Sequence, residues 1–90
     1  MILLLVAIQA ASIESTPYWT CLDKQAARLE RTGERPRDVA LATLDLCNEA
    51  SAKFATDHGY GLTLMMKIHD RLIDKVTARV VELRAKRKGL

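Results

Sequence analysis

Apolar residues recur at helical spacing in three stretches of the chain, and the first stretch lies between Thr16 and Gly33. Thr16 followed by Pro17 is typical of a helix start. The threonine side chain caps the first turn, and proline at the first helical position lacks a backbone N–H that would have no partner within the helix. Gly33 is typical of a helix C-terminus. The apolar side of this stretch comprises Tyr18, Cys21, Leu22, Ala26 and Leu29. The pattern predicts a first helix that ends at Gly33.

The second stretch begins at Pro36 and ends at two closely spaced glycines, Gly59 and Gly61. Its apolar side comprises Val39, Ala40, Leu44, Cys47, Ala50, Ser51 and Phe54. This spacing predicts one second helix that carries all of these residues on a single stripe.

The third stretch is the longest, and its apolar residues recur at steps of three and four over some six turns. They are Leu62, Met65, Met66, His69, Leu72, Ile73, Val76, Val80 and Leu83. A helix over residues 62 to 88 would reach ~40 Å, against ~24 Å for the first helix, so its end must protrude or find a partner. We expect Met65 and Met66 to be core residues, and the alternative is that they form an adaptable binding surface. We expect His69 to be a core or boundary residue with a hydrogen-bond partner.

The two cysteines, Cys21 and Cys47, lie about twelve residues from the break at residues 33–36 on either side. Helices folded back at that break would bring the thiols to the same height, so we predict a disulfide between them. The alternative is a pair of buried free thiols in a cytosolic protein. The predicted fold is all-α: a disulfide-stapled antiparallel helical hairpin plus a long C-terminal amphipathic helix, which together form a three-helix bundle.

Residues 1–12 carry no charged side chain and contain a seven-residue apolar run at residues 2–8. That run is too short to span a bilayer, which needs ~20 apolar residues. It is typical of a cleavable signal peptide, with small residues at Ala10, Ala11 and Ser12, although no Lys or Arg precedes it. The alternatives are a buried first helix or a misplaced start codon. We predict a signal peptide at residues 1–12, a single helical domain over residues 13–90, and a periplasmic or secreted product, where a disulfide persists.

The net charge does not by itself indicate a protein that binds polyanions, because 14 basic and 11 acidic side chains leave only +3. Four cations gather at the end of the third helix: Arg84, Lys86, Arg87 and Lys88. This basic end is a candidate binding site for an anionic lipid surface. The alternative is that these cations complement the helix macrodipole and solubilise a frayed end. Nucleic acid is the weakest partner, because no aromatic residues alternate with the cations.

No motif indicates catalysis or a bound cofactor. Two carboxylates act as general acid and general base only in a cleft that shifts their pKa values apart. Asp70 and Asp74 are four residues apart on a face that we expect to be solvated and surrounded by cations, so we do not expect them to act in this way. His58 and His69 are eleven residues apart, which matches no usual metal spacing. We therefore predict a protein that is not an enzyme and that has no metal site and no cofactor.

Tyr18 and Trp19 are adjacent large aromatic residues in the first helix, so one of them must face away from the second helix. We expect one of the two to pack against the third helix. If neither does, an exposed Tyr18–Trp19 patch beside the disulfide is the candidate contact for a protein partner or a second copy of the chain.

The run Trp19-Thr20-Cys21-Leu22-Asp23 resembles the segment that carries the first disulfide cysteine in periplasmic acid-stress chaperones of enteric bacteria. This resemblance implies an exported helical dimer that loosens at low pH and exposes apolar surface to hold unfolding clients. The sequence departs from the family in that its cysteines are closer together and the second one precedes a long helix. The general plan is also similar to small uncharacterised exported proteins of Gram-negative bacteria, from which no activity follows. We expect an interaction or structural role.

Overall fold

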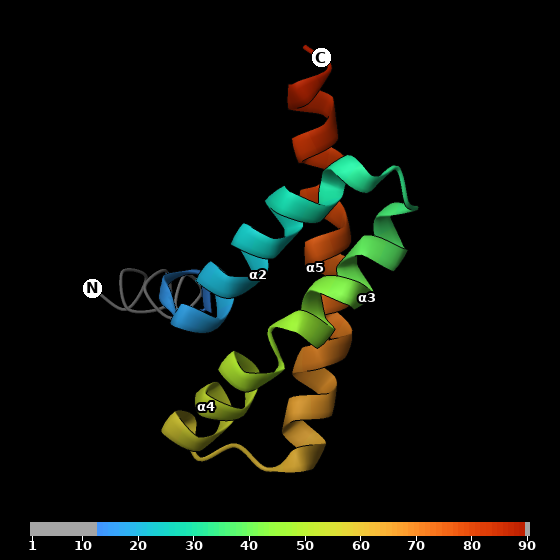
Figure 1. Cartoon of the computed structure of the whole chain (residues 1–90). Coiled ribbons are helices and arrows are strands. Elements are labelled where there is room, and N and C mark those ends of the chain that lie inside the picture. Colours follow the sequence, from blue (N-terminus) through green and yellow to red (C-terminus); the bar gives the residue numbers. More distant parts are fainter. Residues whose placement is uncertain (1–12, 90) are drawn as a thin grey trace, which may run out of the picture.

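The computed structural model describes residues 13–89, and all regular structure in this range is helical (Figure 1). In chain order the elements are the 3₁₀ turn η1 (Ile13–Ser15), α2 (Pro17–Leu29), the 3₁₀ turn η2 (Glu30–Thr32), α3 (Pro36–Leu46), α4 (Asn48–His58) and α5 (Leu62–Arg87). The all-α prediction is confirmed for this part of the chain. The predicted signal peptide at residues 1–12 lies outside the described residues.

Most helix ends lie where the sequence placed them. The Thr16 hydroxyl accepts a hydrogen bond from the Trp19 backbone N–H at 3.3 Å, which caps α2 ahead of Pro17. Gly33 follows η2 with φ of 81°, and Gly59 ends α4 with φ of 67°. Both glycines are in the left-handed region, where a side chain would be strained.

The predicted second helix is two separate helices. The described chain therefore has four α-helices, and the expected number of three is wrong. α3 ends at Leu46, α4 begins at Asn48, and Cys47 between them has φ of −97° and ψ of 22°. Cys47 takes part in the hydrogen bonding of both helices, because its N–H donates to the Thr43 carbonyl at 3.1 Å and its carbonyl accepts from the Ser51 N–H at 3.0 Å. The chain therefore changes direction at Cys47 without leaving the helical path entirely.

The predicted disulfide between Cys21 and Cys47 is present, with the two Cα atoms 6.0 Å apart. It joins the second turn of α2 to the junction of α3 and α4. Cys47 is buried and Cys21 is half-buried, so the bridge lies at the edge of the core.

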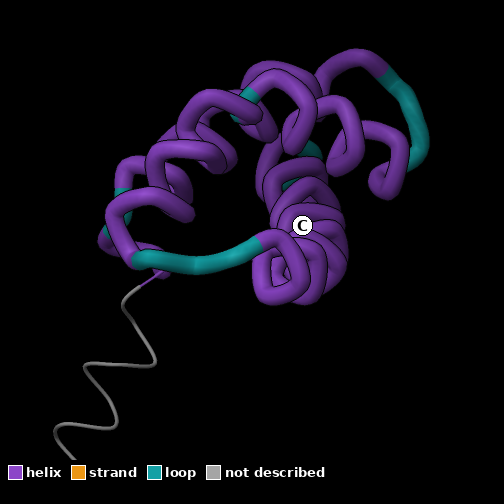
Figure 2. Tube along the Cα trace, turned by 90° about the horizontal axis from the view of Figure 1, so that it is seen from below, coloured by secondary structure: helices purple, strands orange, loops and turns teal. Residues whose placement is uncertain are grey.

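α5 crosses α2 and α3 obliquely (Figure 1), and its 26 residues extend ~39 Å, close to the 40 Å length of the whole molecule. Its C-terminal turns extend past the connection between α2 and α3, as the helix lengths predicted. At the other end α4 and α5 diverge, and the turn that contains Gly59 and Gly61 spans the distance between them (Figures 1 and 2). α5 is therefore covered in its middle and less so at its start.

The core lies where α2, α3 and α5 meet. Its buried apolar residues are Tyr18, Leu22 and Ala26 from α2, Val39, Ala40 and Leu44 from α3, Cys47 at the junction, Phe54 from α4, and Leu72, Ile73, Val76 and Val80 from α5. α4 thus contributes a single residue, which is the physical reason that it leaves the start of α5 poorly covered.

Candidate functional site

The first third of α5 presents an apolar stripe that the other described helices cover only in part: Met65 packs against the core, but Leu62 is 78% exposed and Met66 is 60% exposed. His69 is exposed as well. From Leu72 to Val80 the stripe is buried. The expectation that Met66 is a core residue and His69 a core or boundary residue is therefore wrong, because α4 turns away from α5 instead of packing along it.

These residues form one wall of an apolar groove, which we call the methionine groove. It has a volume of about 250 Å³ and is lined by Ser51 from α4 and by Leu62, Met65, Met66, His69 and Asp70 from α5. Methionine side chains are unbranched and polarisable, so they adapt to partners of different shape. The groove therefore combines adaptable apolar side chains with the polar groups of Ser51, His69 and Asp70.

A second groove, which we call the aromatic groove, lies on another flank of α5. It has a volume of about 340 Å³ and is lined by Ile13, Phe54, Tyr60, Ile68, Arg71, Leu72 and Lys75. Its aromatic wall is held in place by ring contacts: the Phe54 ring centroid lies 5.5 Å from that of Tyr18 and 5.8 Å from that of Tyr60. His58 supports the same wall, because its ring lies 4.3 Å from Phe54 and its Nδ1 is 2.9 Å from the Phe54 carbonyl oxygen.

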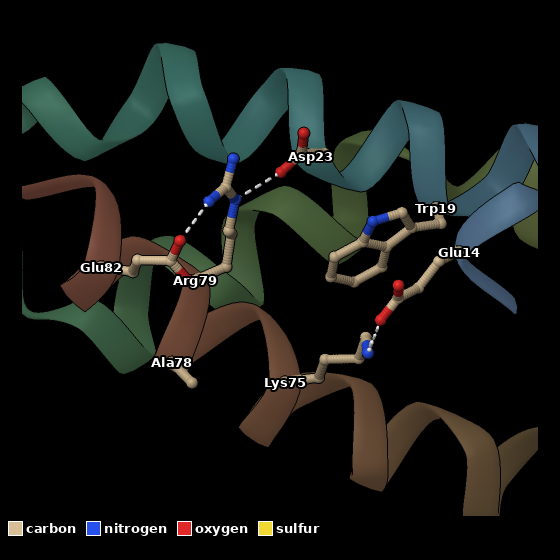
Figure 3. Close-up of a pocket in the computed structure, with 7 residues that line it drawn as sticks. All are labelled: Glu14, Trp19, Asp23, Lys75, Ala78, Arg79 and Glu82. Carbon is tan, nitrogen blue, oxygen red and sulfur yellow. Dashed lines mark hydrogen bonds and ion pairs between the residues drawn. The ribbon is translucent and has the colours of Figure 1, made fainter. Parts of the chain in front are cut away.

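Of the two adjacent aromatic residues, Trp19 faces α5, where Lys75 Nζ lies 5.0 Å from its ring centre, so the exposed Tyr18–Trp19 patch that we expected only if neither residue met the third helix does not form. Tyr18 is only 2% exposed and belongs to the core. Burial raises the pKa of the Tyr18 hydroxyl, and a hydrogen bond with Ser51 opposes that shift. Trp19 is partly buried and lines an open pocket of about 370 Å³ between α2 and α5 (Figure 3). Only Trp19 of the two therefore remains accessible to a partner.

Charges in the Trp19 pocket are paired with one another (Figure 3). Lys75 Nζ lies 2.6 Å from Glu14 Oε1 and 5.0 Å from the centre of the Trp19 ring. Arg79 bridges two carboxylates: its Nε lies 2.7 Å from Asp23 Oδ1 and its Nη1 lies 2.9 Å from a Glu82 oxygen.

The same pairings shift two pKa values in this pocket. The hydrogen bond that Arg79 donates to Asp23 is the main cause that raises the pKa of Arg79. The hydrogen bond from Lys86 is the main cause that lowers the pKa of Glu82. Both shifts stabilise the charged forms, so these groups are held as ions and are poorly suited to exchange protons with a substrate.

The basic end of α5 is largely engaged with neighbouring acceptors. Arg87 Nε lies 2.9 Å from Oε1 of Glu30, a residue that is only 4% exposed, and Arg84 Nε donates to the Glu30 carbonyl at 2.9 Å. Lys86 pairs with Glu82 at 3.0 Å. Lys88 has no ion-pair partner within residues 13–89. These contacts hold the basic end beside the connection between α2 and α3. Binding of an anionic surface there stays a prediction.

The remaining candidate residues show no arrangement for chemistry. Asp70 and Asp74 are both exposed on α5. Within residues 13–89, no three His, Cys, Asp or Glu side chains are grouped closely enough to hold a metal ion. No helix in that same range is both long enough and apolar enough to cross a bilayer.

The sequence indicated the methionine groove only as an alternative, a binding surface at Met65 and Met66 in place of core packing. It gave no sign that Leu62 and Met66 would be exposed, because the expected single second helix would have continued along α5. The aromatic groove had no signal in the sequence, because its lining comes from four separate segments.

Comparison of the chain with protein-family models, with curated proteins and with solved structures found no match.

Proposed function

We propose that this protein is a small, exported, non-enzymatic binding protein that holds apolar segments of other polypeptides in the methionine groove. The observation that carries the proposal is the exposure of Leu62 (78%) and Met66 (60%) on a helix whose stripe is buried from Leu72 to Val80. A contiguous exposed apolar surface marks a site of interaction more often than isolated exposed residues do.

The chemistry of the groove supports an unselective partner. Met65 and Met66 supply adaptable apolar contacts, and His69 and Asp70 supply the polar groups beside them. Covering the exposed parts of Leu62 and Met66 would contribute roughly 2 to 4 kcal/mol, which only approaches the lowest costs of association. We therefore expect weak and reversible holding rather than a tight complex.

The covalent framework supports export. The disulfide between Cys21 and Cys47 is compatible with an oxidising compartment, and the apolar run at residues 2–8 is typical of a signal peptide. We place the mature protein in the periplasm or outside the cell. We further propose that its stable unit is a disulfide-linked antiparallel hairpin of α2 and α3 against which α5 packs, a three-helix bundle with α4 as an appendage.

A more specific form of the proposal is an acid-stress chaperone, for which the resemblance at residues 19–23 is the sequence support. That form requires binding to strengthen as the pH falls, whereas the methionine groove is already open in the structure. Suppression of client aggregation at neutral pH supports a constitutive binding protein, and suppression only after acidification supports the acid-stress form.

The test is aggregation of a thermally unfolding client such as citrate synthase, followed by light scattering. We expect the wild-type protein to slow aggregation and the double variant Leu62→Gln/Met66→Gln to lose most of this effect. The matched control is Leu46→Gln/Val81→Gln, which changes two residues of similar exposure, 53% and 52%, that do not line the groove. Circular dichroism melts of all variants verify folding. Equal protection by the two double variants would show that the groove does not bind the client.

A further inference from the structure

We propose that the aromatic groove binds a single-chain anionic amphiphile, with its alkyl tail among Ile13, Phe54 and Ile68 and its anionic head on Arg71. This inference goes beyond the proposed function, because it concerns a different groove and a different class of ligand. None of the residues that line the aromatic groove lines the methionine groove.

The shape of the groove suits a short alkyl chain. Its volume of about 340 Å³ lies at the lower end of the range for small-molecule sites. Five side chains with apolar bodies line it, and they come from η1, α4, the turn before α5, and α5 itself: Ile13, Phe54, Tyr60, Ile68 and Leu72. A ligand among them would contact segments that lie far apart in the sequence.

The two charged residues among the described lining of the groove are both cations. They are Arg71 and Lys75, which lie one helical turn apart on α5. Lys75 is already paired with Glu14 at 2.6 Å, whereas Arg71 is exposed and has no ion-pair or hydrogen-bond partner within residues 13–89. An unpaired guanidinium beside an apolar surface complements a carboxylate, which it binds through two parallel hydrogen bonds.

The lining also favours an amphiphile over a peptide. Apart from the Tyr60 hydroxyl and the two cations, its side chains offer no hydrogen-bonding group. A peptide that entered the groove would bring backbone N–H and C=O groups that need partners, and leaving them unpaired is costly. An alkyl chain carries no such groups, so only its head needs a polar contact.

The experiment titrates the disulfide-bonded protein with decanoate, decanol and decylammonium below their micelle concentrations, using isothermal calorimetry. These probes share a tail length and differ in the charge of the head. We expect decanoate to bind roughly fivefold more tightly than decanol, the difference that one exposed ion pair contributes, and decylammonium to bind most weakly. Similar affinity for all three probes, or no binding of decanoate, would overturn the proposal.

Two variants locate the head. Arg71→Gln is expected to remove the preference for decanoate over decanol, while Lys67→Gln, an exposed cation of the preceding turn that does not line the groove, is expected to keep it. Because both residues are exposed on α5, neither change removes a core contact. A preference that survives in Arg71→Gln would overturn the assignment of the head to Arg71.

Nuclear Overhauser contacts locate the tail. We expect contacts from the decanoate methylenes to the rings of Phe54 and Tyr60 and not to the methyl group of Met66. Contacts to Met66 alone would place the ligand in the methionine groove and refute the proposed site. Client protection can be lost in Leu62→Gln/Met66→Gln while decanoate still binds, so failure of the proposed function is distinguishable from failure of this inference.

Discussion

Tyr18 shows how a single residue connects α2 to the base of α4. Its ring is 2% exposed and lies 5.5 Å from that of Phe54, the only core residue of α4. Its hydroxyl interacts with Ser51, also on α4. The residue therefore fixes the orientation of α4, and with it the position of both grooves. Sequence periodicity placed Tyr18 on the apolar side of α2 but could not show that its partner would be Phe54.

The ionisation of Tyr18 gives a prediction about stability at alkaline pH. Burial raises its pKa in the folded state above the ordinary value of 10.0. The corresponding stabilisation is fully present below pH 10 and is lost as the pH rises through the folded-state pKa. In a Tyr60→Phe variant, where Tyr18 is the only tyrosine, we expect tyrosinate absorbance to appear above pH 10 and the free energy of unfolding to fall over the same range.

A variant without this hydroxyl provides the control. Tyr18→Phe keeps the ring against Phe54 and removes the ionisable group, so its stability should depend less on pH in that range. Tyrosinate that forms in Tyr60→Phe at or below the ordinary pKa would show that Tyr18 is more accessible than the structure indicates.

At the scale of elements, the sequence was informative wherever the backbone itself dictates an end. Thr16 with Pro17, Gly33 and Gly59 all mark real helix ends, because capping, a fixed proline φ and a positive φ are local properties. The break at Cys47 has no such signal, since neither glycine nor proline lies near it. It coincides with the disulfide and with the point where α3 leaves the crossing with α5, so tertiary contacts override the local helical pattern.

The disulfide is the element-scale feature whose removal is easiest to measure. Its cysteines are 26 residues apart in the chain, and closing a loop of that size in the unfolded state contributes ~3 kcal/mol. We expect Cys21→Ser/Cys47→Ser to unfold at a temperature lower by about 12 to 24 °C, because 1 kcal/mol shifts the melting temperature of so small a domain by about 4 to 8 °C. Circular dichroism melts in oxidising buffer measure this difference.

Reductant provides the matching test, because it should lower the melting temperature of the wild-type protein and leave that of the double serine variant unchanged. Identical melts of the wild-type protein with and without reductant would mean that the bridge adds no stability. A drop in both proteins would point to an effect of the reductant itself.

At the scale of the whole molecule, the sequence predicted that the third helix is longer than the helices it packs against, and that its C-terminal end protrudes. The basic C-terminal turns of α5 do extend past the connection between α2 and α3, as expected. The exposure of Leu62 and Met66 at the other end was not predicted, because it depends on where α4 turns. The aromatic groove combines residues from Ile13 to Lys75, and no periodicity within one helix reports on such a combination.

Glu30 in η2 joins the connection between α2 and α3 to the C-terminal end of α5, and this contact decides how much of the basic end is free. Glu30 holds Arg87 through its carboxylate and Arg84 through its carbonyl. Glu30→Gln should lower stability by about 1 to 2 kcal/mol, less than for a fully buried pair because the Arg87 side chain is 47% exposed. The released Arg87 should then strengthen binding to phosphatidylglycerol vesicles, measured by sedimentation at low and high salt.

Glu34→Gln separates release of the arginine from a simple change in charge. Glu34 is exposed in the same connection and has no ion-pair partner in the described chain, so its neutralisation changes the net charge equally but frees no cation. Stronger vesicle binding by Glu30→Gln than by Glu34→Gln means that Glu30 limits access to the basic end. Equal binding by both variants means that vesicle binding responds only to the net charge of the protein. If the wild-type protein and both variants show no salt-sensitive binding, the role of Arg84 and Arg87 is only to fix α5 to η2.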